Sequence, residues 1–167
     1  VGLEARGVGY SYDGERAVLA GVDFAARPGE LVGIAGASGS GKSTLASILA
    51  GTAEGFEGEV RLGGADIRAL DPDELRRAVV AVGHDSYLFK GTVRDNLLMA
   101  APDASDEALW EALRRCRAEA FVAAAGGLDA PVAARGSNLS GGQRQRLAVA
   151  RALLADAPVY LFDEATS

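Results

Sequence analysis

The stretch Gly36–Thr44 reads Gly-Ala-Ser-Gly-Ser-Gly-Lys-Ser-Thr and matches G-x-x-x-x-G-K-[ST], the pattern of a phosphate-binding loop. The apolar run Leu31–Ala35 before it predicts a buried strand that enters the loop. Leu45, Ile48 and Leu49 after it share one face of a predicted helix. Glycines let consecutive N–H groups point at an anion, and the helix start adds its positive end. The loop therefore predicts a site for a nucleoside triphosphate.

Residue types within this loop indicate how the phosphates would be held. We expect the Lys42 ammonium to reach the β- and γ-phosphates and the Ser43 hydroxyl to bind Mg²⁺. The predicted cofactors are thus ATP and Mg²⁺. The predicted nucleotide-binding residues of this loop are Gly36, Ala37, Ser38, Gly39, Ser40, Gly41, Lys42, Ser43 and Thr44.

Composition places the chain among ordinary globular domains. Its 167 residues are 49% hydrophobic and 24% charged, which is enough for one domain with a core. The net charge of −6 argues against a broad nucleic-acid-binding face, so we expect no nucleic-acid partner. One cysteine excludes an internal disulfide framework. Because the sequence begins at Val1 and stops shortly after Asp163-Glu164, we interpret it as a piece of a longer polypeptide.

The order of apolar runs and turn residues predicts an α/β fold. Strands are expected near Leu3–Val8 and Val18–Phe24, with a further strand at Glu59–Leu62. The region from about residue 85 to 140 looks helical and interrupts the framework. We therefore predict a largely parallel sheet covered by helices, with an antiparallel β subdomain at the N-terminus and a helical subdomain at about 85–140.

Local signals predict where several elements begin. Asp71 followed by Pro72 is a helix start, and Ser105 before two acidic residues is another. A helix is also expected from about Gly142 to Leu154. The valine-rich run Ala78–Val82 and the apolar run Val159–Phe162 predict strands.

Two adjacent acids follow the last of these strands. Asp163 and Glu164 stand where the Walker B motif places its acids, at the end of an apolar strand. A carboxylate there can hold Mg²⁺, and the next one can polarise the attacking water. Two acids that merely open an exposed loop would be the simpler explanation for such a pair alone, but the phosphate-binding loop supplies the other half of a Mg-ATP site.

The segment Leu139–Gln143 reads Leu-Ser-Gly-Gly-Gln and precedes the predicted helix. Standing alone, a flexible turn with a serine cap explains it equally well. Together with the following Arg144-Gln145-Arg146 and the upstream phosphate-binding loop, it resembles the signature motif of the ATP-binding cassette (ABC) ATPases. The resemblance covers nearly the whole chain and implies a P-loop NTPase core with an antiparallel β subdomain and a helical signature subdomain. It also implies that the C-terminal part of the domain lies beyond this sequence.

The resemblance implies a dimer in which two cassettes pack head to tail around ATP. Asp163 would bind Mg²⁺, and Glu164 would be the general base. Tyr12 matches the aromatic residue that stacks on adenine, although a core tyrosine at a strand end is the alternative. The residues implied to contact the nucleotide of the partner cassette are Ser140, Gly141, Gly142 and Gln143.

The segment Tyr87–Leu97 resembles the exporter branch of this family. The resemblance implies that Leu88–Leu97 contacts transmembrane domains of a transporter, so the domain would lie at the cytoplasmic face of the membrane. The apolar side chains of Tyr87, Leu88 and Phe89 could instead belong to the core.

Two positions depart from the family pattern. His84 stands where exporter cassettes usually have a glutamine, and a neutral imidazole can offer one acceptor nitrogen to Mg²⁺ or to the attacking water. A structural histidine at a strand end is the alternative. Ala134 replaces a common glutamate before Arg135-Gly136. The interface residues that the family carries after Walker B lie beyond Ser167, so we expect this fragment to bind ATP but to hydrolyse it poorly.

These observations favour an ATPase domain of an ABC exporter-type transporter, with Lys42, Glu164 and His84 as its catalytic residues. Mg²⁺ would be held through Ser43, Asp163 and His84. A soluble ABC ATPase acting on nucleic acid or ribosomes is the main alternative, and the acidic balance argues against it. A phosphate-loop kinase is a weaker one, because it leaves Leu139–Gln143 unexplained.

Overall fold

The computed structural model describes residues 1–14, 16–83 and 87–163. The chain divides into two compact units, Val1–Ala81 and Val82–Ser167. Among the described residues, none of the helices combines the length and the apolar character that crossing a bilayer requires.

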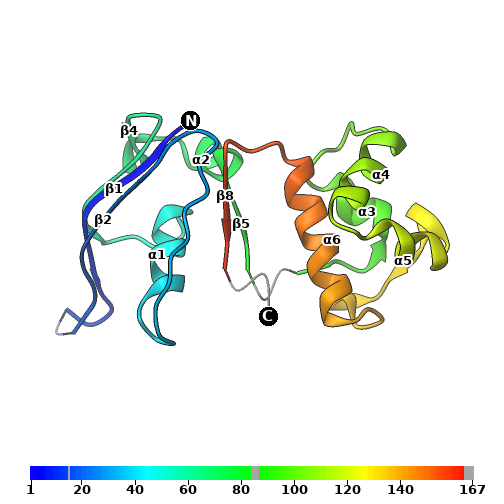
Figure 1. Cartoon of the computed structure of the whole chain (residues 1–167), viewed down its shortest axis with the longest axis horizontal. Coiled ribbons are helices and arrows are strands. Elements are labelled where there is room, and N and C mark those ends of the chain that lie inside the picture. The colour runs from blue at the N-terminus through cyan, green and yellow to red at the C-terminus, as the bar shows by residue number, and fades with distance from the viewer. Residues whose placement is uncertain (15, 84–86, 164–167) are drawn as a thin grey trace. The chain divides into compact units, whose positions relative to one another are not determined.

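The first unit contains an antiparallel sheet of four strands. They are β1 (Leu3–Ser11), β2 (Ala17–Ala26), β3 (Glu57–Leu62) and β4 (Ala65–Asp66), in the spatial order β2-β1-β3-β4 (Figure 1). One face of the sheet is apolar because alternate residues of a strand point the same way, and its buried side chains include Leu3, Ala5, Val60 and Leu62. Val8 is also buried, after an irregularity in the register of β1 that follows Ala5. The predicted N-terminal antiparallel sheet is confirmed.

The first unit also contains two α-helices. Helix α1 (Lys42–Leu49) buries Leu45, Ile48 and Leu49, as their spacing predicts. After the 3₁₀ turn η1 (Ile67–Ala69), helix α2 (Pro72–Ala78) begins at the predicted position. The Asp71 carboxylate caps α2 by accepting hydrogen bonds from the N–H groups of residues 73 and 74, at 2.8 and 3.2 Å.

The strand predicted at Leu31–Ala35 is wrong for this structure, which has no regular element there. The Leu31 residue is 95% exposed, and Ile34 is 47% exposed. A strand exists only where its backbone groups pair with a neighbouring strand. Within the described part of the chain no strand pairs with this segment, so its apolar pattern alone does not produce a strand.

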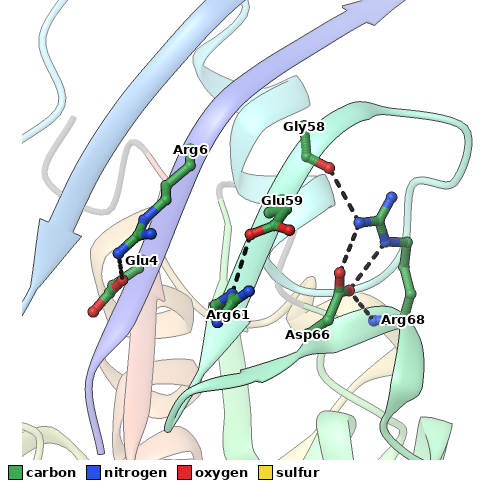
Figure 2. A network of polar contacts seen from close by, with 7 residues as sticks. All are labelled: Glu4, Arg6, Gly58, Glu59, Arg61, Asp66 and Arg68. Atoms are coloured by element: carbon green, nitrogen blue, oxygen red, sulfur yellow. Dashed lines mark hydrogen bonds and ion pairs between the residues drawn. The ribbon is translucent and has the colours of Figure 1, made fainter.

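The solvent-facing side of the sheet carries alternating charges (Figure 2). In the register of β1 and β3, Glu4 lies opposite Arg61, and Arg6 lies opposite Glu59. At the edge, the Arg68 guanidinium donates to the Asp66 carboxylate at 2.7 Å and to the Gly58 carbonyl at 3.1 Å. The hydrogen bond from the Arg68 side chain lowers the pKa of Asp66 to about 2. The residues in Figure 2 are Glu4, Arg6, Gly58, Glu59, Arg61, Asp66 and Arg68.

Replacing Asp66 with asparagine should lower the free energy of unfolding near neutral pH. At very low pH the replacement should leave the free energy of unfolding unchanged. The folded-state pKa of Asp66 lies below the ordinary value of about 3.9, so its interaction with Arg68 stabilises the fold above about pH 4. This contribution is lost as the pH falls from about 4 to about 2. For a partly exposed pair we expect at most about 1 kcal/mol.

Urea unfolding of the parent and of Asp66→Asn across this pH range measures the difference. The matched control is Asp103→Asn, an exposed aspartate in the loop before α4. A stability difference between the parent and Asp66→Asn that stays constant from about pH 6 to about pH 2 would contradict the prediction.

The second unit contains a helical bundle. Figure 1 shows helices α3 (Val93–Leu98), α4 (Asp106–Arg115) and α5 (Glu119–Ala124) beside the longer α6 (Gly141–Leu154). Helix α6 packs against α3 and α4, and Leu147 and Ala150 of α6 join their apolar core. The short strands β6 (Gly91–Thr92) and β7 (Pro131–Val132) pair antiparallel at one side.

The predicted starts of the bundle helices are confirmed. The Ser105 hydroxyl caps α4 by accepting from the N–H of Ala108 at 3.3 Å, and the predicted apolar residues Leu109 and Leu113 are fully buried. The 3₁₀ turns η2 (Gly127–Asp129) and η3 (Ala134–Gly136) connect the remaining elements. Strands β5 (Val79–Val82) and β8 (Val159–Phe162) also lie where the sequence predicts them.

Candidate functional site

The phosphate-binding loop folds back on its own lysine. The Lys42 ammonium donates to the carbonyl oxygens of Gly36 and Ala37, each at 2.8 Å. The N–H of Ser40 donates to the Ala37 carbonyl at 3.2 Å and closes a turn inside the loop. The loop therefore holds the Lys42 ammonium next to its own backbone, and its residues Ala37–Ser40 are exposed.

Gly41 is required by this geometry. Its φ is +88°, in the left-handed region that favours glycine. A Cβ built on it would lie 2.7 Å from a methyl group of Leu19 and 3.0 Å from the Val18 carbonyl oxygen on β2. The loop can approach β2 this closely only without a side chain at residue 41.

The start of α1 offers backbone N–H donors that make no hydrogen bond within the helix. Gly41 is the N-cap and makes no side-chain capping bond, and the first helical bond runs from the N–H of Leu45 to the Gly41 carbonyl at 2.9 Å. The N–H groups of the first turn therefore have no partner within the helix. Ser43 is exposed beside them. Together with the helix dipole and Lys42, these donors suit an anion with several oxygens, such as a polyphosphate.

Tyr12 lies next to the start of the same helix. Its hydroxyl is 2.9 Å from the Thr44 hydroxyl, and its ring meets the Tyr10 ring edge-on with the centroids 5.0 Å apart. The Tyr12 residue is nevertheless 72% exposed. The alternative of a core tyrosine is therefore wrong, and the ring has a free face near the phosphate-binding loop.

The predicted signature begins helix α6 in the second unit. Ser140 and Gln143 form a capping box: the Ser140 hydroxyl accepts from the Gln143 N–H at 3.2 Å, and the Gln143 side-chain oxygen accepts from the Ser140 N–H at 2.9 Å. Gly141 and Gly142 follow on the exposed surface. The hydroxyl proton of Ser140 remains available, because the oxygen acts as the acceptor in the cap.

Two arginines donate hydrogen bonds to backbone carbonyls at this helix start. Arg144 donates to the Leu139 carbonyl at 2.8 Å, and Arg146 donates to the Gly142 carbonyl at 3.1 Å. Gly136, with φ +64°, lies under Arg144, and a Cβ there would come within 2.9 Å of that side chain. The exposed glycines are thus held by neighbours on both sides.

Of the two acids that follow β8, the structure describes Asp163. The N–H of Asp163 donates to the Val82 carbonyl at 2.9 Å, which places Asp163 directly beyond the end of β5. Glu164 and His84 lie outside the described residues, so their predicted roles remain predictions. Within residues 1–14, 16–83 and 87–163, no group of three His, Cys, Asp or Glu side chains could hold a metal ion by itself.

The segment before α3 divides its apolar residues between the core and the surface. Leu88 is 1% exposed and joins the core of the bundle, whereas Tyr87 and Phe89 are 44% and 46% exposed. Their rings contact each other edge-on with the centroids 4.7 Å apart. The core explanation is thus correct for Leu88 and wrong for the two aromatic residues.

Asn96 holds this segment in place, and the sequence analysis assigned it no role. It is 2% exposed, accepts from the Phe89 N–H and donates to the carbonyls of Phe89 and Thr92, at 2.8 to 2.9 Å. The sequence does contain a signal for it, because residues 93, 96 and 97 share one helical face. Arg94, on α3, pairs with Asp106 and with Asp129, which ties α3 to α4 and η2.

The structure thus brings Tyr12 together with the phosphate-binding loop in the first unit. The second unit contains the signature, Asp163 and the aromatic pair.

Comparisons with known proteins agree with these features. A family model described as ABC transporter matches residues 19–167. An uncharacterized ABC transporter ATP-binding protein of Haemophilus influenzae is 43% identical over 100% of this chain and 30% of its own length. The mycobactin import ATP-binding/permease protein IrtB of Mycolicibacterium thermoresistibile is 45% identical over 99% of this chain and 28% of its own.

A solved structure is also similar. A bacterial Atm1-family ABC exporter with ATP bound superposes with a TM-score of 0.92 at 37% identity, over 99% of this chain and 29% of the exporter chain. This chain therefore spans less than a third of the length of these three proteins.

Proposed function

Because this chain belongs to the ABC transporter family, we propose that it binds and hydrolyses ATP for a membrane transporter of exporter-type architecture. The observation that carries the proposal is the phosphate-binding loop, where Lys42 and the first-turn N–H groups of α1 converge. Such a site suits the polyphosphate of a nucleotide. One relative is named for import and the solved neighbour for export, so we propose no substrate.

We propose Ser43, Asp163 and His84 as the residues that hold the magnesium ion. Mg²⁺ binds through oxygen atoms and keeps several waters and phosphate oxygens, so one hydroxyl and one carboxylate suffice from the protein. Ser43 and Asp163 fit this donor set, and His84 would add an imidazole nitrogen. The ion, when bound, neutralises charge on the β- and γ-phosphates. Glu164 would accept the proton of the attacking water.

We propose that the signature contacts ATP bound to a second cassette. The capping box holds Ser140 in place, while Gly141 and Gly142 let the γ-phosphate approach the N–H groups of α6. Gln143 contributes by fixing the backbone of this helix start. ATP would then join two cassettes, because each nucleotide needs a loop from one and a signature from the other.

The membrane domains would dock on Leu88–Leu97. The exposed aromatic pair of Tyr87 and Phe89 supports this, because an exposed apolar cluster on a rigid base favours a protein contact. The rigid base is supplied by the buried Leu88 and Asn96. The domain would lie at the cytoplasmic face of the membrane. The alternative of a nucleic-acid ATPase is disfavoured, since the relatives compared include an ATP-binding/permease protein.

Replacing Ser140 with arginine tests the proposal. In a head-to-tail dimer the arginine would block the γ-phosphate of the partner, so ATP hydrolysis by the natural full-length protein should fall at least about a hundredfold. ATP binding to the phosphate-binding loop should stay nearly unchanged. Hydrolysis and equilibrium ATP binding are measured on the same preparations.

Two control variants show whether a loss of hydrolysis comes from blocking the γ-phosphate or from unfolding of the domain. Ser140→Ala loses the helix cap, about 1 kcal/mol, without adding bulk. Ser137→Arg places the same arginine on an exposed residue just before the signature. The proposal would be overturned if Ser140→Arg hydrolysed ATP like the Ser137→Arg control. Phosphate transfer to an acceptor by a monomer would instead support the kinase alternative.

A further inference from the structure

The hydrogen bond between Tyr12 and Thr44 joins an exposed side chain to a buried one. Thr44 is 8% exposed in the first turn of α1, whereas Tyr12 is 72% exposed directly after the end of β1. Their hydroxyl oxygens are 2.9 Å apart. A buried, β-branched side chain has few rotamers, so Thr44 is a rigid anchor and Tyr12 is the group that it holds.

The Tyr12 backbone is already held by its turn. The Ser11 hydroxyl accepts from the Gly14 N–H at 3.0 Å. Its single proton has two acceptors within reach, the Arg16 carbonyl at 2.9 Å and the Asp13 carboxylate at 3.1 Å. Only the side-chain torsions of Tyr12 are left to be set. The edge contact with Tyr10 and the hydroxyl bond to Thr44 together set them.

We propose that the Thr44 hydroxyl is a positioning group for Tyr12, holding its ring ready to stack on the base of a bound nucleotide. The inference rests on the proposed function, since it needs the phosphates in the loop. The phosphate site and the base site would then share Thr44, whose N–H belongs to the first turn of α1. A ring that is fixed in advance loses less conformational freedom when a planar base stacks on it.

The experiment compares two ligands on the natural full-length protein. The affinity for ATP depends on contacts to the base and to the phosphates, whereas the affinity for inorganic tripolyphosphate depends on phosphate contacts alone. Both affinities are measured with Mg²⁺. Ordering one side chain corresponds to about a threefold to tenfold change in affinity. Tyr12→Phe keeps the ring and should weaken ATP binding by this factor, while tripolyphosphate binding stays unchanged.

Further variants show whether Thr44 is the anchor. Thr44→Val keeps the shape without the hydroxyl and should weaken ATP binding as much as Tyr12→Phe does. The double variant should bind ATP no more weakly than either single one, because both remove the same bond. Thr44→Ser retains the hydroxyl and should therefore weaken ATP binding less than Thr44→Val does. Thr52→Val removes an exposed threonine hydroxyl shortly after α1 and serves as the matched control.

Each other outcome overturns the inference. Parent-like ATP binding by Tyr12→Phe would mean that the ring needs no anchor, and tighter binding would mean that the bond holds the ring away from the base. An equal loss of tripolyphosphate affinity in Thr44→Val would assign its hydroxyl to the phosphates alone. Failure of the proposed function would look different, because Lys42→Ala would then bind both ligands like the parent.

Discussion

Replacing Lys42 with alanine is expected to weaken ATP binding about tenfold to a hundredfold. Hydrogen bonds to charged groups contribute about 1.5–3 kcal/mol each, and this ammonium is the cation that the loop itself holds, through the carbonyls of Gly36 and Ala37. The variant also loses those two bonds, so the loop that presents its N–H groups becomes less ordered. Equilibrium binding of ATP with Mg²⁺ measures the effect.

The sequence provides a close control for this variant. Its only other lysine is Lys90, which is exposed in the second unit. Lys90→Ala removes the same charge and should bind ATP like the parent. If the two alanine variants bound ATP equally well, Lys42 would have no special part in holding phosphate, and the assignment of the loop would be wrong.

Replacing Glu164 with glutamine is expected to remove ATP turnover without removing ATP binding. Glutamine keeps the shape of the side chain but cannot accept the proton of the attacking water, and general bases contribute about 10²–10⁴-fold to a rate. The two cassettes should then remain joined around unhydrolysed ATP. Phosphate release measures the first effect, and size-exclusion chromatography with Mg-ATP measures the second.

Glu54→Gln is the matched control, because Glu54 is an exposed glutamate to which no role in ATP binding or hydrolysis is assigned. It should hydrolyse ATP at the parent rate and give no stable dimer. Turnover at the parent rate by Glu164→Gln would show that another group activates the water. Loss of turnover without a trapped dimer would contradict the head-to-tail arrangement.

The sequence was sufficient wherever a feature depends on residues a few positions apart. The caps at Asp71, Ser105 and Ser140 each use bonds to N–H groups two or three residues further on, so their residue types predict them. The buried faces of α1 and α4 follow from helical spacing for the same reason. The phosphate-binding loop also belongs here, because its chemistry is contained in nine consecutive residues.

The sequence was insufficient wherever a feature depends on what lies across from it. Leu31–Ala35 has the composition of a buried strand but pairs with no strand in the described part of the chain. Leu88 and Phe89 are both apolar, and only the packing of the bundle places Leu88 inside and leaves Phe89 outside.

Sequence alone therefore identified the family, predicted a nucleotide as the ligand and located the starts of several helices. The tertiary structure determined which apolar side chains are exposed for a partner, and it joined Tyr12 to Thr44 across 32 residues. The physical reason is that caps, turns and helical faces are local interactions. Burial and long-range hydrogen bonds instead depend on neighbours that only the folded chain brings together.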